Sequence, residues 1–386
     1  MIPRRERRAQ IEVHKSIVTP PEQIMTDDSL AGFATLSDLE EAASKKADKS
    51  AWAYIQGGAG EEWTMRANRE AFHRRTLRPR VLVDVENLEL GTTILGTKVS
   101  APFYVSPTAS HGLVHPDAEA ATARSASQGN ILAGFGTLAS ISLEDIAWAA
   151  PGGPRWFQLY LQPEFSTTKS LVERAERANY KAIVLTVDMP VAGTRDGETR
   201  AGSPLASSIV LGNGPEVVRP LRNPIIEGDH AHIRKEASNT WDVLDRLHET
   251  TRLPLVLKGI LTREDARRAV DHRAKAVVVS NHGGRQLDGA PASLDALPEV
   301  VEEVGSEIEI YFDGGIRRGS DIVMALALGA KAVGLGRLVL WALAAGGEAG
   351  VSKLLSLLKT DLATVMALTG RRTLSEIDKS LVSTPR

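Results

Sequence analysis

The sequence contains eight short apolar segments that are separated by stretches of helical composition. The segments are rich in valine and isoleucine, and their hydrophobic residues follow one another without alternation. Such runs are typical of strands buried on both faces of a parallel sheet that is flanked by helices. The segments lie at 103–109, 131–137, 155–160, 182–188, 253–259, 276–282, 310–315 and 332–337.

Amphipathic helical patterns lie between these segments, at 117–127, 168–178, 263–272 and 320–329. Thr262 precedes the third of them and is a suitable N-cap, because its hydroxyl can accept a hydrogen bond from the first helical turn. Eight strand-helix units predict a (β/α)₈ barrel. A doubly wound sheet is the alternative, but eight regular units favour closure.

The remaining chain divides around this barrel, which we place at about 100–370 within a single domain at 36–386. Residues 1–35 are expected to form a tail. Its first ten residues, "MIPRRERRAQ", are locally basic and are expected to be solvated, with a presequence or interaction arm as the alternative. The helical-looking residues between the tail and the barrel are expected to cap it. Residues 196–238, after the fourth strand, are irregular and rich in glycine and proline, which predicts a lid loop.

Composition excludes several function classes. The net charge of −2 creates no field that would attract nucleic acid or an anionic membrane. There are no cysteines and no HExxH spacing, so neither disulfides nor a common metal site is expected. The most apolar stretch, 326–347, carries Lys331 and Arg337, which favours a buried strand and core helix over a membrane span. We expect a soluble, cytoplasmic protein.

Almost every predicted strand ends in a polar group. Active sites of (β/α)₈ barrels form at the carboxyl ends of the strands, so these side chains are expected to meet at one mouth of the barrel. They are Thr108, Gln158, Tyr160, Thr186, Asp188, Lys258, Ser280, His282, Asp313, Gly336 and Arg337.

Two glycine-rich turns follow the last two strands, "DGGIRRGSD" at 313–321 and "GLGR" at 334–337. In barrels this is where backbone N–H groups and a helix start bind phosphate. Arg317 and Arg337 would add positive charge. The alternative interpretation is two tight turns with solvated arginines.

Three further features indicate acid-base chemistry on an anionic substrate. His282 and a carboxylate such as Asp188 can form a general base that works near neutral pH. Arg195 and Arg285 can grip a substrate carboxylate through paired N–H groups. Lys258 could stabilise an anionic cofactor or intermediate, or could be exposed or paired with Asp188.

Several ordered motifs resemble one family. The stretches "SNHGGRQLDGAPASLDALPEV", "LKGI", "FDGGIRRGSD", "GLGR", "YIQGGAGEEWTMRANREAF", "SPTASHGLVHPDAE", "WFQLY" and "LTVDMPVAGTRD" are similar to the FMN-dependent 2-hydroxy acid oxidases and dehydrogenases. The resemblance extends from about Leu36 to the carboxyl terminus. It is greatest to the L-lactate oxidase branch, with lactate monooxygenase as a near relative.

This resemblance implies an FMN enzyme that oxidises an (S)-2-hydroxy acid to the 2-oxo acid, assembled as a homotetramer. It makes His282 the base, oriented by Asp188, with Tyr160 near the substrate oxygen. The implied substrate-binding residues are Tyr54, Arg195, Arg285, Tyr160 and Leu138. The implied FMN-binding residues are Thr108, Ala109, Gln158, Thr186, Lys258, Ser280, Asp313, Gly314, Gly315, Arg317, Gly336 and Arg337.

Some positions depart from the family pattern. Gly136 and Leu138 stand where most of the oxidases carry a serine and an aromatic residue. A leucine there resembles the monooxygenase branch, whereas Ala109 resembles the oxidases. The segment "GETRAG", at 197–202, replaces a more basic sequence. We expect an oxidase that produces H₂O₂ from O₂; a lactate 2-monooxygenase, a dehydrogenase with a quinone or protein acceptor, and a non-redox phosphate-binding barrel are the alternatives.

Overall fold

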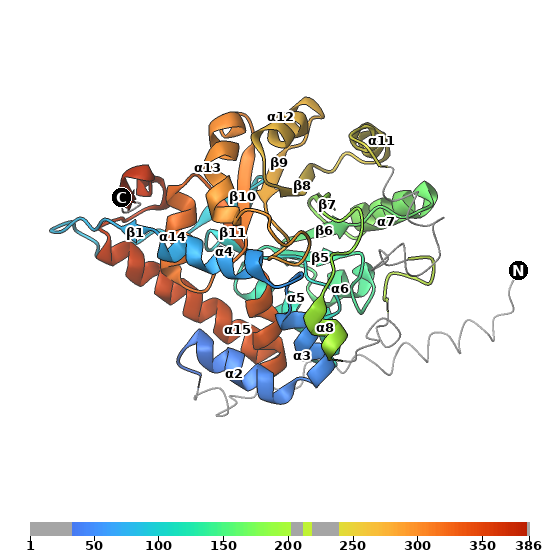
Figure 1. Ribbon diagram of the computed structural model, residues 1–386, viewed down its shortest axis with the longest axis horizontal. Helices are drawn as coiled ribbons and strands as arrows, with labels where there is room; N and C mark the ends of the chain where they lie inside the picture. The colour runs from blue at the N-terminus through green and yellow to red at the C-terminus, as the bar shows by residue number, and fades with distance from the viewer. Residues whose placement is uncertain (1–32, 202–210, 218–238, 384–386) are drawn as a thin grey trace, which may run out of the picture. The chain divides into compact units, whose positions relative to one another are not determined.

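A closed barrel of eight parallel strands forms the centre of the protein (Figure 1). The computed structural model describes residues 33–201, 211–217 and 239–383. Around the barrel the strands follow the order β10-β11-β4-β5-β6-β7-β8-β9. Their bounds are β4 Phe103–Val105, β5 Ala133–Gly136, β6 Arg155–Leu159, β7 Ile183–Thr186, β8 Leu255–Ile260, β9 Ala276–Val279, β10 Glu309–Asp313 and β11 Ala332–Leu335. The predicted (β/α)₈ barrel is confirmed.

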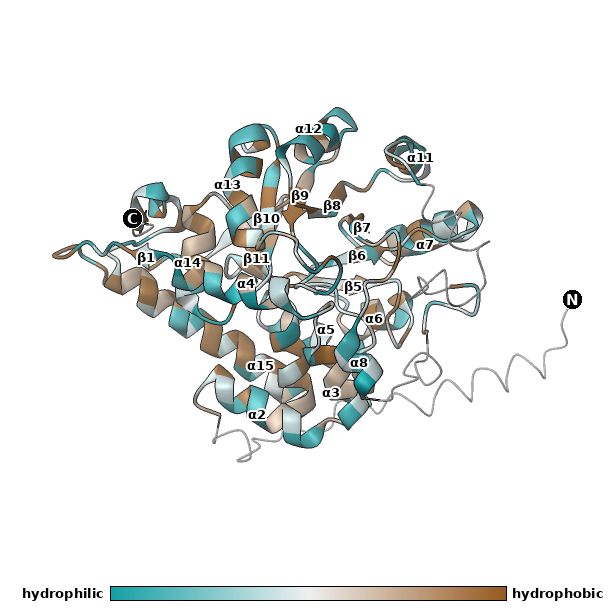
Figure 2. Cartoon of the chain, viewed as in Figure 1, coloured by the Kyte–Doolittle hydropathy of each residue, from teal (hydrophilic) through white to brown (hydrophobic). Residues whose placement is uncertain are grey.

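Helices follow the strands and cover the outside of the barrel. The α12 helix begins where predicted, because the Thr262 hydroxyl accepts a hydrogen bond of 3.3 Å from the Asp265 N–H. In Figure 2, α12 is largely hydrophilic whereas the neighbouring strands β8 and β9 are hydrophobic, as expected for a solvated helix on a buried sheet. The helix bounds are α5 Ala118–Gln128, α6 Leu143–Ala149, α7 Phe165–Arg177, α11 Asp242–Thr250, α12 Arg263–Asp271, α13 Ser293–Val304, α14 Gly319–Ala327 and α15 Arg337–Leu368.

The amino-terminal end of the barrel is closed by aromatic side chains and a hairpin. Inside the barrel, the ring centroids of Tyr104, Trp156 and Tyr311 lie 5.4 to 6.0 Å apart. The antiparallel strands β2 (Thr92–Ile94) and β3 (Thr97–Val99) pack Ile94 and Val99 against this cluster. The sequence analysis did not predict this hairpin. It leaves the opposite, carboxyl end of the strands as the open mouth.

Within the described residues, three helices precede the barrel, α2 (Leu36–Lys46), α3 (Lys49–Gln56) and α4 (Trp63–His73). Asn68 of α4 exchanges side-chain hydrogen bonds of 2.9 and 2.8 Å with Asn281, which follows β9. Arg69 forms an ion pair of 2.8 Å with Asp321 in α14. These contacts hold α4 against the loops at the carboxyl ends of the strands, as the predicted helical cap requires.

The predicted lid loop at 196–238 is only partly described. Its first residues form a short helix, α8 (Asp196–Arg200), so the expectation of an irregular segment is wrong there. Residues 202–210 and 218–238, like residues 1–32 of the predicted tail, lie outside the described residues. Strands β1 (Thr76–Leu77) and β12 (Val382–Ser383) pair near the end of the chain.

Helix α15 accounts for the most apolar stretch of the sequence. Within the described residues it is the one helix long and apolar enough to cross a membrane by length and composition, and 72% of its most apolar window is buried inside the fold. Gly346 and Gly347 interrupt its helical backbone. The stretch at 326–347 is thus β11 followed by a core helix, as the charges within it predicted.

Candidate functional site

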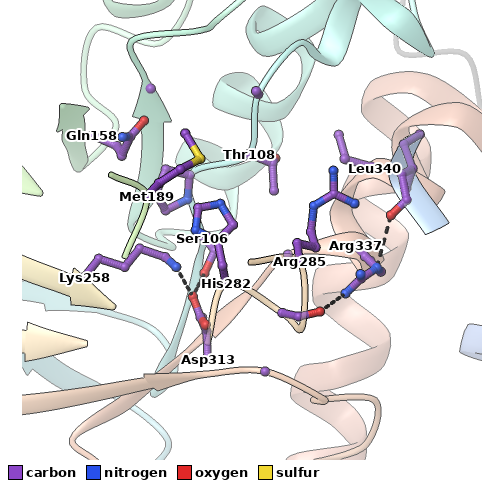
Figure 3. A pocket seen from close by; sticks show the side chains of 18 of the residues that line it. Ser106, Thr108, Gln158, Met189, Lys258, His282, Arg285, Asp313, Arg337 and Leu340 are labelled. Atoms are coloured by element: carbon purple, nitrogen blue, oxygen red, sulfur yellow. Dashed lines mark hydrogen bonds and ion pairs between the residues drawn. The ribbon is translucent and has the colours of Figure 1, made fainter. Parts of the chain in front are cut away.

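A cavity of about 310 Å³ opens at the carboxyl ends of the barrel strands (Figure 3). It brings together most of the residues that the sequence predicted for a site. Those that line it are Tyr54, Thr108, Ala109, Leu138, Gln158, Tyr160, Arg195, Lys258, His282, Arg285, Asp313, Gly314, Gly315, Arg317, Gly336 and Arg337. Three predicted residues do not line it but lie behind residues that do: Thr186, Asp188 and Ser280.

The loop after β9 places His282 in an unusual backbone conformation. The strand ends at Val279, and His282 has a φ of 59°, in the left-handed region. Its backbone N–H donates to the Ser280 hydroxyl at 3.1 Å. His282 therefore lies beyond the end of β9. A turn, rather than strand alternation, directs the imidazole into the cavity.

His282 is paired with Asp188. Its Nδ1 lies 2.9 Å from Asp188 Oδ1, which leaves Nε2 as the nitrogen available to a substrate. Burial lowers the pKa of His282, although the Asp188 charge opposes this shift. Burial would raise the pKa of Asp188, but the charge and hydrogen bond of His282 outweigh it and the pKa is lowered. The pair therefore holds a neutral imidazole beside an ionised carboxylate at neutral pH.

The close approach of Asp188 depends on Gly259 in β8. Gly259 has a φ of +115°, and a Cβ atom there would lie 2.5 Å from the Asp188 Cβ. A side chain at this position would be strained and would displace the carboxylate. The sequence analysis missed this role, and the glycine directly after Lys258 in "LKGI" is the signal that could have indicated it.

Two arginines and a tyrosine line one side of the cavity. The guanidinium carbons of Arg285 and Arg195 lie 5.0 and 5.9 Å from the centre of the Tyr54 ring. Arg285 Nη1 donates to the carbonyl oxygens of Tyr54 and Gly57, each at 2.7 Å. Burial, and next the charge of Arg195, lowers the pKa of Arg285 to about 10, so it still carries its proton at neutral pH. This pair can bind a carboxylate in the cavity.

Glu198 of α8 is a charged residue that the sequence analysis did not assign. It is fully buried, and its Oε1 lies 3.0 Å from Arg195 Nη1 and 3.7 Å from Arg285 Nη2. The segment containing it was noted only as a departure from a family pattern, and its contact with both arginines requires the folded chain.

Arg337 lies at the opposite side of the cavity from Lys258 (Figure 3), and Arg317 also lines the cavity. Arg337 donates to the carbonyl oxygens of Ile55, Gly283 and Gly57 at 2.9 to 3.1 Å. Burial lowers the pKa of Arg317 to about 10 and that of Arg337 well below its ordinary value. Neither guanidinium forms an ion pair with a carboxylate in the described part of the chain.

Partly buried cations that lack an ion-pair partner are costly, so this end of the cavity calls for an anion. Gly314 and Gly315 follow β10 with φ of 114° and 83°, and a Cβ at Gly315 would lie 2.6 Å from the Asn68 carbonyl oxygen. These glycines therefore allow the backbone to approach a ligand closely at the carboxyl ends of β10 and β11. A phosphate group fits these donors and charges.

Lys258 occupies the middle of the site and is bound from two directions. Its Nζ lies 3.0 Å from Asp313 Oδ2 and donates to the Ser280 hydroxyl at 2.8 Å. Ser280 in turn donates to Asp313 Oδ1 at 2.5 Å. The alternatives of an exposed lysine and of a Lys258–Asp188 ion pair are wrong in this structure. Nearby, Gln158 donates to Thr186 at 3.0 Å, which orients its amide at the cavity wall.

The remaining wall is apolar and was largely missed. Met189, Ala192 and Leu340 line the cavity together with the predicted Leu138. Met189 directly follows Asp188, and Leu340 lies in the first turn of α15, but neither has a chemical property that marks it as a site residue in the sequence. Beside this wall the cavity offers a site for a phosphate, then polar donors, then a base and a site for a carboxylate. This arrangement suits a flavin nucleotide and a small organic acid.

The fold and site thus define a barrel oxidoreductase that uses a phosphate-bearing cofactor. Residues 43–384 match the FMN-dependent dehydrogenase family. The chain is 44% identical to 2-hydroxyacid oxidase 2 of Mus musculus, covering 91% of this chain and 98% of that one. It is 45% identical to L-lactate oxidase of Nostoc sp., covering 90% and 97%. Mandelate oxidase has a similar structure, with a TM-score of 0.83, 40% identity and coverage of 92% and 98%.

The protein belongs to the FMN-dependent dehydrogenase family. Its relatives establish it as an FMN-dependent enzyme of the 2-hydroxy acid oxidase group. The family resemblance that the sequence motifs predicted is confirmed, and so is FMN as the cofactor. A non-redox phosphate-binding barrel is not supported.

Proposed function

We propose that the protein oxidises an (S)-2-hydroxy acid with a lactate-like side chain to the 2-oxo acid and delivers the electrons to O₂. The observation that carries this proposal is the His282–Asp188 pair, which shares one cavity with Arg195 and Arg285. The substrate loses two electrons and two protons. Bound FMN supplies the two-electron acceptor and passes the electrons to O₂, which is released as H₂O₂.

The protein residues bind and orient the acid. Arg195 and Arg285 hold its carboxylate, with Tyr54 beneath their guanidinium groups. His282 Nε2 takes the substrate proton, and Asp188 stabilises the imidazolium that forms. Burial raises the pKa of Tyr160, so its phenol stays protonated and can donate a hydrogen bond to the substrate oxygen.

The other end of the cavity holds FMN. Arg317, Arg337 and the backbone at Gly314, Gly315 and Gly336 bind the phosphate. Lys258, held by Asp313 and Ser280, would stabilise the negative charge that the flavin ring acquires on reduction. The residues assigned to the ring and ribityl chain are Thr108, Ala109, Gln158, Thr186, Ser280 and Asp313.

The electron acceptor and the product are inferred from the names of the relatives and from two residues of the cavity wall. The similar proteins carry the names 2-hydroxyacid oxidase, L-lactate oxidase, glycolate oxidase and mandelate oxidase. Ala109, which resembles the oxidases, lines the cavity and supports the same acceptor. Leu138 lines it too and favours a second candidate, a lactate 2-monooxygenase that releases a decarboxylated acid.

One experiment separates these functions. The FMN-loaded protein is mixed with a series of (S)-2-hydroxy acids without oxygen, and flavin bleaching is followed. Oxygen is then admitted, and peroxide and organic product are assayed. We expect rapid bleaching, then one H₂O₂ and one 2-oxo acid for each turnover. A decarboxylated acid without peroxide would identify the monooxygenase. Slow reoxidation of the flavin by oxygen would identify a dehydrogenase with a quinone or protein acceptor. Absence of bleaching with every acid would refute the proposal.

We also propose a homotetramer in the cytoplasm. Val81 and Leu82 are 81% and 103% exposed, and an apolar pair of this kind on a loop supports burial between subunits. Light scattering coupled to size-exclusion chromatography measures the mass directly, and a mass of one chain would contradict the assembly. Cell fractionation tests the compartment.

A further inference from the structure

Glu198 is buried against the guanidinium groups of Arg195 and Arg285, two of the four arginines that line the cavity. Its Oε1 lies 3.0 Å from Arg195 Nη1 and 3.7 Å from Arg285 Nη2, and the residue is 0% exposed. The side chain comes from α8, whereas Arg285 comes from the loop after β9. Glu198 itself does not line the cavity, so it acts on a bound acid through its charge and through the arginines, not by contact.

The position of Glu198 fixes the charge that a substrate carboxylate meets. Two like-charged guanidiniums lie side by side here, and burial, followed by the charge of Arg195, lowers the pKa of Arg285. One buried carboxylate offsets one of the two positive charges. Of the other charged groups at the cavity, Lys258 pairs with Asp313 and Asp188 is directed at His282, whereas Arg317 and Arg337 are assigned to the phosphate of FMN.

We propose that Glu198 limits the enzyme to acids with a single carboxylate, by leaving the Arg195–Arg285 pair with one uncompensated positive charge. This inference rests on the proposed function, because it assigns the carboxylate of the 2-hydroxy acid to these arginines. A second carboxylate near the reacting carbon would meet Glu198 without a positive charge to offset it. Glu198 is thus a specificity residue that acts through its neighbours.

Coulomb energy scales with the product of the charges, which makes the inference quantitative. Glu198→Gln keeps the shape of the side chain and an oxygen that accepts from Arg195, but removes the negative charge. If this tightens binding of a monoanion about tenfold, it tightens binding of a dianion of the same shape about a hundredfold. The ratio of the two dissociation constants then changes about tenfold.

Oxamate and oxalate are suitable probes, because they have nearly the same shape and carry one and two negative charges. The absorbance of bound flavin is titrated with each anion, without turnover, in the FMN-loaded wild type and variants. We expect Glu198→Gln to change the oxalate-to-oxamate ratio about tenfold in favour of oxalate, and Glu198→Asp to keep the wild-type ratio. Asp196→Asn is the matched control, since Asp196 lies on the same helix but pairs with the exposed Arg200.

Several outcomes would overturn the inference. An unchanged ratio in Glu198→Gln means that the carboxylate has only a structural role, and a shift of equal size in Glu198→Asp means that shape rather than charge matters. If Glu198→Gln does not retain flavin, Glu198→Ala removes the same charge and must show the same shift. If the wild type binds neither anion and no 2-hydroxy acid bleaches its flavin, the proposed function itself fails.

Discussion

His282 Nδ1 and Asp188 Oδ1 lie 2.9 Å apart, although the two residues follow different strands and are separated by 94 positions in the chain. Asp188 follows β7 and His282 follows β9, so the pair spans the end of β8, where Gly259 lies. This contact fixes which ring nitrogen of the histidine faces the cavity. The protonation state of the base therefore depends on the positions that the closed barrel gives to the loops after β7 and β9.

Replacing His282 should remove the base without removing the binding site. We expect His282→Gln to slow flavin reduction by a factor of about 10² to 10⁴, the range typical of a lost general base. Stopped-flow absorbance under anaerobic conditions measures this rate. The dissociation constant for oxamate should stay within a few-fold of the wild type, and a normal reduction rate in the variant would remove His282 from its assigned role.

The rate of flavin reduction should rise with pH. Because burial holds the pKa of His282 below its ordinary value of 6.5, the imidazole loses its proton at a lower pH than in the unfolded chain. The neutral base is present above this pKa, so we expect a plateau at neutral pH and a fall as the pH drops through it. Asp188→Asn removes a carboxylate that raises this pKa, and should move the falling limb to lower pH. A limb centred above pH 7 in the wild type would contradict the assignment.

Gly259→Ala should disturb catalysis while leaving FMN in place. The added Cβ would lie 2.5 Å from the Asp188 Cβ, on a backbone with a φ of +115°. We expect Asp188 to shift and flavin reduction to slow at least tenfold, with unchanged flavin content. Gly96→Ala is the control, since Gly96 also has a positive φ of +74° but open space around it. Equal effects of the two substitutions on the reduction rate would argue against the contact.

Arg337→Met should weaken FMN binding and stabilise the protein that lacks FMN. A charge-assisted contact to phosphate contributes about 1.5 to 3 kcal/mol, so the dissociation constant for FMN should rise about 10- to 100-fold. Without the anion, the buried guanidinium is an uncompensated charge, and its removal should raise the melting temperature of the apoprotein. Flavin-fluorescence titration and thermal melts measure both effects. A lower melting temperature of the apoprotein would show that the carbonyl contacts of Arg337 outweigh its desolvation.

Leu138→Trp should narrow the range of acids that the enzyme accepts. Leu138 lines the cavity, and a larger ring there would fill space that an aliphatic side chain could use. We expect kcat/KM for acids with four or more carbons to fall at least tenfold relative to that for lactate. Steady-state peroxide production with a chain-length series tests this, and a parallel loss for every acid would place Leu138 outside the side-chain pocket.

The sequence predicted the barrel because each strand is a continuous apolar run, and a parallel sheet buries both faces of such runs. It predicted most of the cavity because strand ends converge in this fold. It could not predict the left-handed turn at His282, the Glu198 contact with two arginines, or the partner of Lys258. These depend on loop geometry and on pairs distant in the chain, which local patterns do not encode. The β2–β3 hairpin was missed because each of its strands has three residues.

Carbonyl groups at the end of α3 bind two of the four arginines that line the cavity, since Gly57 accepts from Arg285 and from Arg337. The amino-terminal helices and the two ligand sites therefore share the same hydrogen-bonding groups. If the docking of α3 tightens the binding of a ligand to these arginines, the ligand stabilises the docking of α3 by the same factor, by thermodynamic linkage. Protection of the α3 amides from hydrogen exchange should accordingly report the occupancy of a cofactor that α3 itself does not need to touch.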